Sequence, residues 1–258
     1  MKIRSLLFLA AVGAALLVPA AAEAAPANGL AEQTQLILTA DRLVPVFSYS
    51  STKVTETNGN TTIKDTTSGS STSLLFGSEP LGVRTVHTVP RVGFDFAVIP
   101  HLTVGGSLAF AFSLGGSHEV ETNQNNTTTT TKVDSPSTTV IGIAPRVGYV
   151  IPLGEVFAFW PRAGFGFYSV RTSSEDDDRN GRSRFTTRDT IFSLDLDPQF
   201  AIVPIEHFFF HVGPILNVPL SGSRSSETVR GATTTTVDND LTVWHFGVNA
   251  GLGGWFNL

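Results

Sequence analysis

The sequence predicts an all-β fold, an eight-stranded antiparallel up-and-down transmembrane β-barrel with short turns at one end and long loops at the other. Three observations support this prediction. Hydrophobic and polar residues alternate along the chain, short and long connections alternate between these segments, and aromatic residues gather beside the short connections. Helical periodicity is nearly absent, and period-2 segments bounded by Gly, Pro, Asn and Ser recur from about residue 36 to the end.

The clearest alternating segment covers residues 102–114. One parity is apolar and holds Leu102, Val104, Leu108, Phe110, Phe112 and Leu114. The other parity is small and polar and holds Thr103, Gly105, Ser107, Ala109 and Ser113. The same pattern predicts eight strands, an even number, near residues 36–50, 82–99, 102–114, 139–151, 156–170, 188–203, 208–218 and 239–258.

The connections between these strands are of two kinds. Three are short and carry a proline, at residues 99–101, 151–155 and 203–207, and their prolines are 52 residues apart both times. The other four are long and rich in Thr, Ser, Asn, Gly and charge, at roughly 51–80, 115–138, 171–187 and 219–238. A repeat of 52 residues therefore corresponds to one hairpin, and all short turns lie at one end of the barrel.

The first segment has the features of a secretory signal peptide rather than of the fold. Lys2 and Arg4 precede an apolar run that is too short to span a bilayer as a helix, and Ala22-Glu23-Ala24 is a small-x-small cleavage signal. We predict a signal peptide at residues 1–24, a short N-terminal periplasmic segment at 25–35 and a barrel domain at 36–258. Cleavage after Ala22 is the alternative.

Composition excludes several functional classes. The chain has no cysteine, which excludes a disulfide scaffold, a thiolate metal site and a lipid anchor on an N-terminal Cys. Removing residues 1–24 leaves 15 basic and 21 acidic residues, and this net charge of −6 argues against a nucleic-acid partner.

The apolar parity of the strands is predicted to face lipid, whereas in a soluble sandwich it would face a core. The opposite parity carries many glycines and few charges, as expected of a narrow lumen. Aromatic residues on the apolar parity beside the short turns have the position of an interfacial girdle. They are Phe94, Phe96, Phe157, Phe159, Phe200, Phe208, Phe210 and Phe256.

The sequence ends on apolar residues, which a barrel explains by pairing its last strand with its first. Gly253, Phe256 and Leu258 resemble the C-terminal assembly signal of bacterial outer-membrane barrels, although Leu258 replaces the usual terminal Phe. Together with the hairpin pattern, the sequence resembles the eight-stranded Gram-negative outer-membrane barrels, the class that contains the membrane domain of OmpA, OmpX and OmpW. This resemblance implies an outer-membrane location, with lipid, lipopolysaccharide and the barrel-assembly machinery as partners.

The inward parity carries a small set of ionisable residues near the expected mid-membrane height. They are Arg91, Asp95, Arg146, Arg162, Asp195 and Asp197. Isolated charges in a narrow low-dielectric interior are costly, so we expect these three arginines and three aspartates to pair. The network is either a fixed polar plug or a gate that exchanges partners to open.

Other candidate sites are weaker. His87, His211 and His245 fall on the inward parity without metal-ligand spacing, so we expect buried hydrogen-bonded histidines and no cofactor or metal. Residues 176–181 match the opening of a calcium loop, but Thr187 replaces the closing Glu and Arg residues crowd the segment. A solvated hairpin tip with an Asn-Gly turn is the better interpretation.

The expected function is a structural and surface-display role with a polar, charge-paired lumen. The alternative is a narrow channel or conduit for small or hydrophobic solutes, as in the OmpW class. We expect no enzyme, because none of the six histidines begins the His-x-Ser pattern of barrel deacylases. The Thr-rich stretches at 125–131 and 233–236 are expected in soluble outer loops, with extended strands as the alternative.

Overall fold

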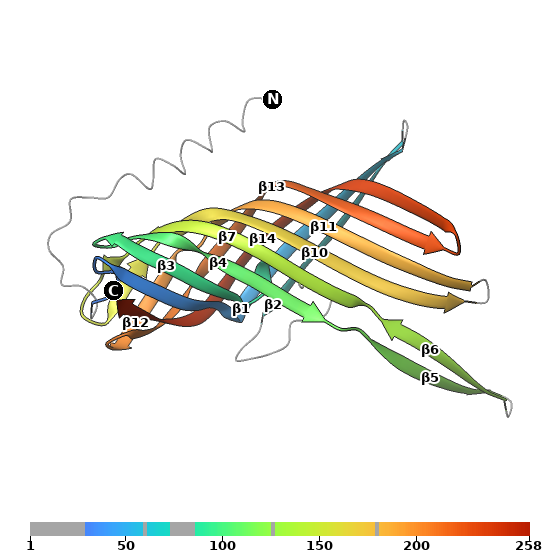
Figure 1. Cartoon of the computed structure of the whole chain (residues 1–258), viewed down its shortest axis with the longest axis horizontal. Coiled ribbons are helices and arrows are strands. Elements are labelled where there is room, and N and C mark those ends of the chain that lie inside the picture. Colours follow the sequence, from blue (N-terminus) through green and yellow to red (C-terminus); the bar gives the residue numbers. More distant parts are fainter. Residues whose placement is uncertain (1–28, 59–60, 73–85, 125–126, 179–180) are drawn as a thin grey trace.

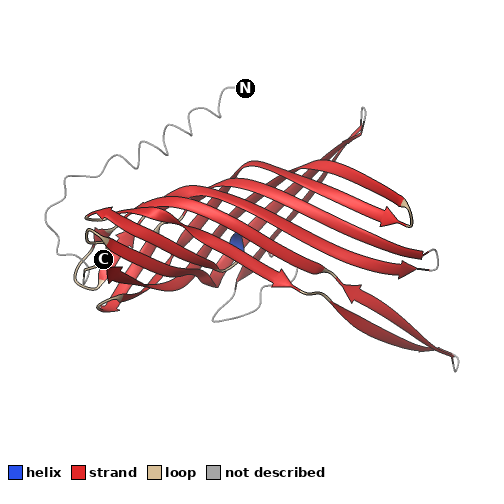
Figure 2. Ribbon diagram, viewed as in Figure 1, coloured by secondary structure: helices blue, strands red, loops and turns tan. Residues whose placement is uncertain are grey.

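The computed structural model describes residues 29–58, 61–72, 86–124, 127–178 and 181–258. The predicted signal peptide lies outside the described residues. Almost every described residue is in a strand, and the strands form one elongated barrel that continues into hairpins at one end (Figures 1 and 2). No described helix is long and apolar enough to cross a membrane.

Eight strands close the barrel, as predicted. The ring runs β1, β3, β4, β7, β10, β11, β13 and β14, every neighbour is antiparallel, and β1 pairs with β14 to close it. The bounds of these strands are Gln35–Asn58 (β1), Arg91–Ile99 (β3), Leu102–Ser113 (β4), Ser137–Tyr149 (β7), Arg162–Asp178 (β10), Gly181–Leu196 (β11), Phe208–Arg230 (β13) and Thr233–Asn257 (β14).

Two predicted strands are interrupted near the short-turn end. The predicted strand 156–170 divides at Pro161 into β9 (Phe157–Trp160) and β10, and the predicted strand 188–203 divides at Pro198 into β11 and β12 (Gln199–Ile205). Proline lacks the N–H that a strand ladder needs, which explains both breaks. A two-residue strand, β8 (Ile151–Pro152), pairs with β9 at the same end.

The four long connections are hairpins rather than soluble loops, which corrects the interpretation of the Thr-rich segments. Thr favours strands, and the segments pair with their neighbours in register. β2 (Thr61–Thr72) folds back on β1, and β10 with β11 and β13 with β14 continue far beyond the barrel. β5 (Gly116–Gln124) and β6 (Thr127–Ser135) form a separate two-stranded sheet (Figure 1).

The predicted strand 82–99 is wrong in its first part. Residues 82–85 lie outside the described residues, and Val86–Thr88 form a short 3-10 helix, η1, whose side chains are buried. The strand itself begins at Arg91, directly after Pro90. The chain therefore enters the barrel interior before it joins the wall (Figure 2).

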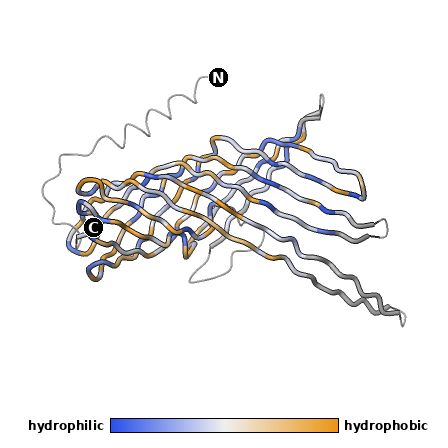
Figure 3. Tube along the Cα trace, in the orientation of Figure 1, coloured by the Kyte–Doolittle hydropathy of each residue, from blue (hydrophilic) through white to orange (hydrophobic). Residues whose placement is uncertain are grey.

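The apolar parity faces outward, as predicted. On β4, Val104, Leu108, Phe110 and Phe112 are exposed, and Phe112 reaches 72%. Leu102 and Phe112 are ten positions apart, which is roughly 33 Å along a strand and about 25 Å in height at the usual tilt. That height matches the apolar band of a transmembrane barrel. Figure 3 shows most of the apolar colouring on the barrel, where it alternates with polar colouring, and little of it on the hairpins.

The last strand is held between the first strand and β13. Gly253 lies opposite Thr39, and Phe256 lies opposite Leu36. Leu258 follows the strand, is 75% exposed, and its N–H donates to the carbonyl of Thr34 at 3.0 Å. The pairing with β13 extends to Gly254 and the pairing with β1 to Asn257, so the apolar residues at the end of β14 are ordered.

Candidate functional site: the charged layer of the lumen

The six predicted lumen residues are all buried inside the barrel, each less than 10% exposed. Three of them lie in one row of paired residues across the barrel wall, in which charged residues alternate with glycine. The row runs Asp95, Gly105, Arg146, Gly164 and Asp195 across β3, β4, β7, β10 and β11. Because glycine has no side chain, each long charged group can cross over the neighbouring strand to reach its partner.

Arg146 is the centre of the network. It donates from Nη2 and Nε to the two carboxylate oxygens of Asp95, at 2.6 and 3.1 Å. Nη1 donates to Asp41 at 2.5 Å, and Nη2 also reaches the hydroxyl of Thr39 at 3.2 Å. The guanidinium therefore holds two carboxylates at once, and the pairing with Asp95 is the bidentate fork that arginine makes best.

Arg162 extends the network from the other side of the shared aspartate. Its Nη1 donates to Asp41 at 3.1 Å and its Nη2 to Asp197 at 2.7 Å. The guanidinium also lies over the indole ring of Trp160, 4.8 Å from the centroid. Asp41 thus bridges Arg146 and Arg162, so the two arginines belong to one connected cluster.

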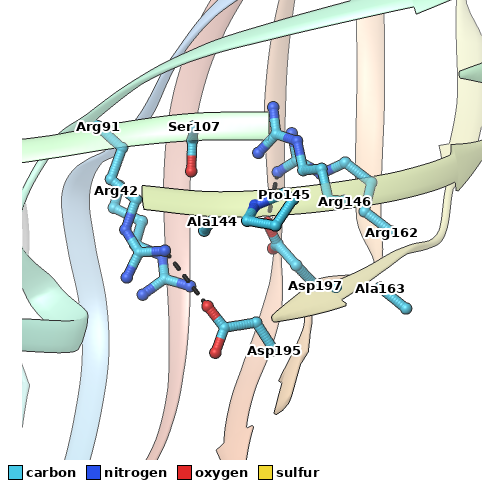
Figure 4. A pocket seen from close by; sticks show the side chains of 11 residues that line it. Arg42, Arg91, Ser107, Ala144, Pro145, Arg146, Arg162, Ala163, Asp195 and Asp197 are labelled. Atoms are coloured by element: carbon cyan, nitrogen blue, oxygen red, sulfur yellow. Dashed lines mark hydrogen bonds and ion pairs between the residues drawn. The ribbon is translucent and has the colours of Figure 1, made fainter. Parts of the chain in front are cut away.

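A second part of the network surrounds Asp195. Arg91 approaches this carboxylate at 3.4 Å, Tyr168 donates to it at 2.8 Å and Ser193 at 2.6 Å. The guanidinium of Arg91 lies over the ring of Tyr168 at 4.9 Å. Figure 4 shows Arg91 and Arg42 pointing toward Asp195, with Arg146, Arg162 and Asp197 on the other side of the same layer.

Sequence reasoning missed Asp41 and Arg42, which are both buried in the lumen. Asp41 keeps the inward parity of Ile37 and Thr39, whereas the alternation fails at Arg42. It fails because β1 carries three residues between Ala40 and Val44 where β14 carries one. Arg42 has a φ of 58°, in the left-handed region, and its Nη1 donates to the carbonyl of His87 in η1. Two sequence signals could have found them: Asp41 shares the parity of Thr39, and the two residues form an adjacent charged pair inside an apolar segment.

Among the residues whose burial the structure describes, four arginines and four aspartates are buried, rather than three of each. They are Arg42, Arg91, Arg146, Arg162, Asp41, Asp95, Asp195 and Asp197. The cluster is balanced in charge before any histidine is protonated. A cavity of about 20 Å³ lies among these side chains, which is room for one water molecule (Figure 4).

Apolar side chains fill the lumen on both sides of the charged layer. Toward the short turns the cluster includes Trp160, Phe209, Trp255 and Leu30, all essentially without exposed surface. Leu30 belongs to residues 29–34, which cross this end and bond to the turns through the N–H of His101 and the carbonyl of Ala31 at 2.8 Å. On the hairpin side a second cluster holds Val86, Ala109, Val140, Tyr168, Ile191, Leu241 and Val243.

The three predicted inward histidines are buried, but they do not converge on a metal site. His211 lies 3.2 Å from Asp41 and 3.0 Å from Gln199. The rings of His87 and His245 stack at 5.6 Å. Within the described part of the chain, no group of three or more His, Cys, Asp or Glu side chains could hold a metal ion.

His245 takes part in a hydrogen-bonded series that the sequence pattern did not reveal. Its Nε2 lies 3.0 Å from the hydroxyl of Ser48, and its Nδ1 lies 3.0 Å from the side-chain oxygen of Asn217. The series has the arrangement of a Ser-His-Asp catalytic triad, with Asn in the place of the Asp. All three side chains are buried in the lumen, and Ser48 and His245 are 197 residues apart in the sequence.

The described residues of the possible calcium loop at 176–181 belong to two paired strands. Asp176, Asp177 and Asp178 are consecutive positions of β10, and Asp178 pairs with Gly181 on β11. Asn180 lies outside the described residues. Gly181 is already in β11, so the predicted Asn-Gly turn is wrong at Gly181.

No protein-family model and no curated protein matches the sequence. Solved structures with a similar fold include the outer membrane protein OprG from Pseudomonas aeruginosa, with a TM-score of 0.44 and 12% identity over 88% of this chain and 98% of that chain. For the attachment invasion locus protein Ail of Yersinia pestis, the TM-score is 0.32 and the identity is 11% over 87% of this chain and 100% of that chain. For the outer membrane protease OmpT from Escherichia coli, the TM-score is 0.39 and the identity is 7% over 86% of this chain and 97% of that chain.

These likenesses concern the fold alone. The chain is an eight-stranded antiparallel β-barrel. The predicted fold class is thereby confirmed by the closed ring of strands. The roles predicted for the charged layer and for Gly253, Phe256 and Leu258 stay predictions.

Proposed function

We propose that the protein is an integral outer-membrane barrel with a sealed lumen, whose role is structural and surface-interactive. The exposed apolar band of about 25 Å supports a location in lipid, since residues such as Phe110 and Phe112 have no protein partner to cover them. In this arrangement the short turns lie in the periplasm and the four hairpins project from the cell. The hairpins then offer backbone edges and polar surface to extracellular partners.

The filled lumen is the observation that carries the sealed-barrel proposal. A solute crossing the barrel must displace the apolar cluster around Trp160 and Trp255, separate the ion pairs of Arg146, and pass the second apolar cluster with η1. Breaking a buried ion pair leaves an uncompensated charge and is costly. A conduit for small or hydrophobic solutes is the competing proposal, and it requires these layers to move together.

Planar-bilayer recording separates a plug from a gate. We expect the wild-type barrel to show no steady conductance, and we expect Asp195→Ala to remain closed because the apolar cluster beneath Asp195 is unaffected. If the Asp195 pairs form a gate, the variant conducts. Large steady currents through wild type would rule out the plug, and uptake of graded solutes by liposomes gives an independent measure.

The C-terminal residues fit a recognition role during assembly. Phe256 and Leu258 are exposed at the end of β14, where they are available before the barrel closes and face the membrane interface afterwards. We propose that Gly253, Phe256 and Leu258 are read by the barrel-assembly machinery through this last strand.

We propose that the Ser48, His245 and Asn217 series is structural and that the protein is not an enzyme. A nucleophilic serine needs space for an acyl group beside it, whereas Ser48 is buried and its ring partner is stacked on His87. We expect no covalent labelling of the folded barrel by a fluorophosphonate. Labelling that disappears in Ser48→Ala but persists in Ser50→Ala would establish a serine enzyme instead.

A further inference from the structure

Two arginines face each other on the outer surface of the barrel wall, just above the apolar band. Arg171 on β10 lies directly opposite Arg188 on β11, and both side chains are exposed. Directly opposite residues on one face of an antiparallel pair have Cβ atoms about 5 Å apart, and like charges there are destabilising. The wall therefore brings together two positive charges at a cost that a bound anion would remove.

Neither arginine is neutralised by the protein. Among the described residues, Arg171 and Arg188 take part in no ion pair, whereas Arg184 pairs with Glu175 and Arg224 pairs with Asp189. The nearest acid in the outward register is Glu227, diagonal to Arg188. The flanking positions instead supply hydroxyl groups, from Ser169, Ser173, Thr186 and Thr190 on the two strands and from Thr139 and Ser225 on their outer neighbours.

The height of the pair matches a lipid head group rather than the hairpin tips. The rings of Phe167 and Phe192 stack at 4.3 Å in the same two strands and form the last aromatic row on the outward parity of this wall. Arg171 is four positions beyond Phe167, roughly 13 Å along the strand and about 10 Å higher at the usual tilt. Side chains at that level reach the head groups of the leaflet on the hairpin side.

We infer that Arg171 and Arg188 form a clamp for the phosphate of an outer-leaflet lipid, with lipopolysaccharide as the occupant. Two guanidinium groups side by side present several donors to phosphate oxygens, and arginine is the residue suited to such bidentate recognition. The hydroxyl groups around the pair can donate to the same phosphate. The apolar row below it then contacts the acyl chains of the same lipid. This inference rests on the proposed outer-membrane location.

The test measures lipid binding by the mature chain refolded in a neutral detergent, with divalent cations chelated so that they cannot bridge charges. The probes are a short-chain lipopolysaccharide and the same lipid with its lipid A phosphates removed. We expect Arg171→Gln with Arg188→Gln to bind the phosphorylated lipid roughly tenfold to a hundredfold more weakly than wild type. Dephosphorylated lipid should bind both proteins equally.

The matched control removes two positive charges elsewhere on the same end. Lys64→Gln with Arg230→Gln changes exposed residues away from the clamp and should bind like wild type. In lipid-free detergent, the clamp variant should unfold at the same or a higher temperature than wild type, because the like-charge pair is gone. If the two arginines had a merely structural role, the clamp variant would unfold at a lower temperature than wild type.

Three outcomes would overturn the clamp. If wild type binds both lipids equally, the clamp does not recognise the phosphate. If the control variant loses as much affinity as the clamp variant, the effect is one of net charge. If millimolar inorganic phosphate competes with the lipid, the site binds free phosphate rather than a lipid head group. Each of these leaves the proposed membrane location intact, provided that the wild-type chain inserts into vesicles as a heat-resistant barrel. Failure of that insertion contradicts the proposed function itself.

Discussion

Arg146→Met is expected to destabilise the folded barrel strongly in lipid vesicles. Arg146 is the arginine that holds Asp95 in ion pairs, and it also contacts Asp41, inside a lumen where both carboxylates are buried. Removing one partner of a buried pair typically destabilises by about 3–5 kcal/mol, because the remaining charge stays buried without compensation. The measurement is the free energy of unfolding from urea titration of the refolded barrel, followed by tryptophan fluorescence.

The control is the same substitution at an exposed pair. Arg184 is 60% exposed and pairs with Glu175, so Arg184→Met should change the free energy of unfolding by less than about 1 kcal/mol. Adding Asp95→Asn to Arg146→Met should restore much of the lost stability, because the orphaned charge is gone. Equal effects of the two methionine substitutions would show that the charged layer is open to water and does not behave as a buried network.

Gly105→Ala is expected to abolish the folded barrel through a single methyl group. A Cβ at Gly105 would lie 2.0 Å from the carbonyl oxygen of Phe94 and 2.6 Å from the Cα of Asp95, both backbone atoms of β3. These atoms cannot turn aside as a flexible side chain can, so β3 must move away from β4. That movement takes Asp95 away from Arg146, and the packing cost alone is about 1–3 kcal/mol.

Gly116→Ala is the matched control for this prediction. Gly116 begins β5, and a Cβ there would meet nothing within 4 Å, so the substitution should be close to neutral. Heat-resistant migration on a cold gel distinguishes the folded barrel from the unfolded chain for both variants. A folded Gly105→Ala barrel with wild-type stability would show that β3 and β4 are farther apart than the structure places them.

The sequence by itself determined the features that depend on alternation along one strand. Period-2 patterning predicted the outward apolar face and the inward position of Arg146 and Asp195, because a strand places successive side chains on opposite faces. The alternation of short and long connections predicted the short turns at one end. The apolar terminus and the even number of strands also predicted closure, which β1 and β14 provide.

Only the tertiary structure decided which side chains meet. Arg146 is 105 residues from Asp41, and Ser48 is 197 residues from His245, so these contacts depend on strand register around the whole ring. The bulge after Ala40 shifts the parity of β1, so that Arg42 is buried beside Asp41 and a later inward residue such as Ser48 is even-numbered, which alternation cannot predict. Register is a property of paired strands rather than of one strand, and for that physical reason the sequence located the charged layer but not its partners.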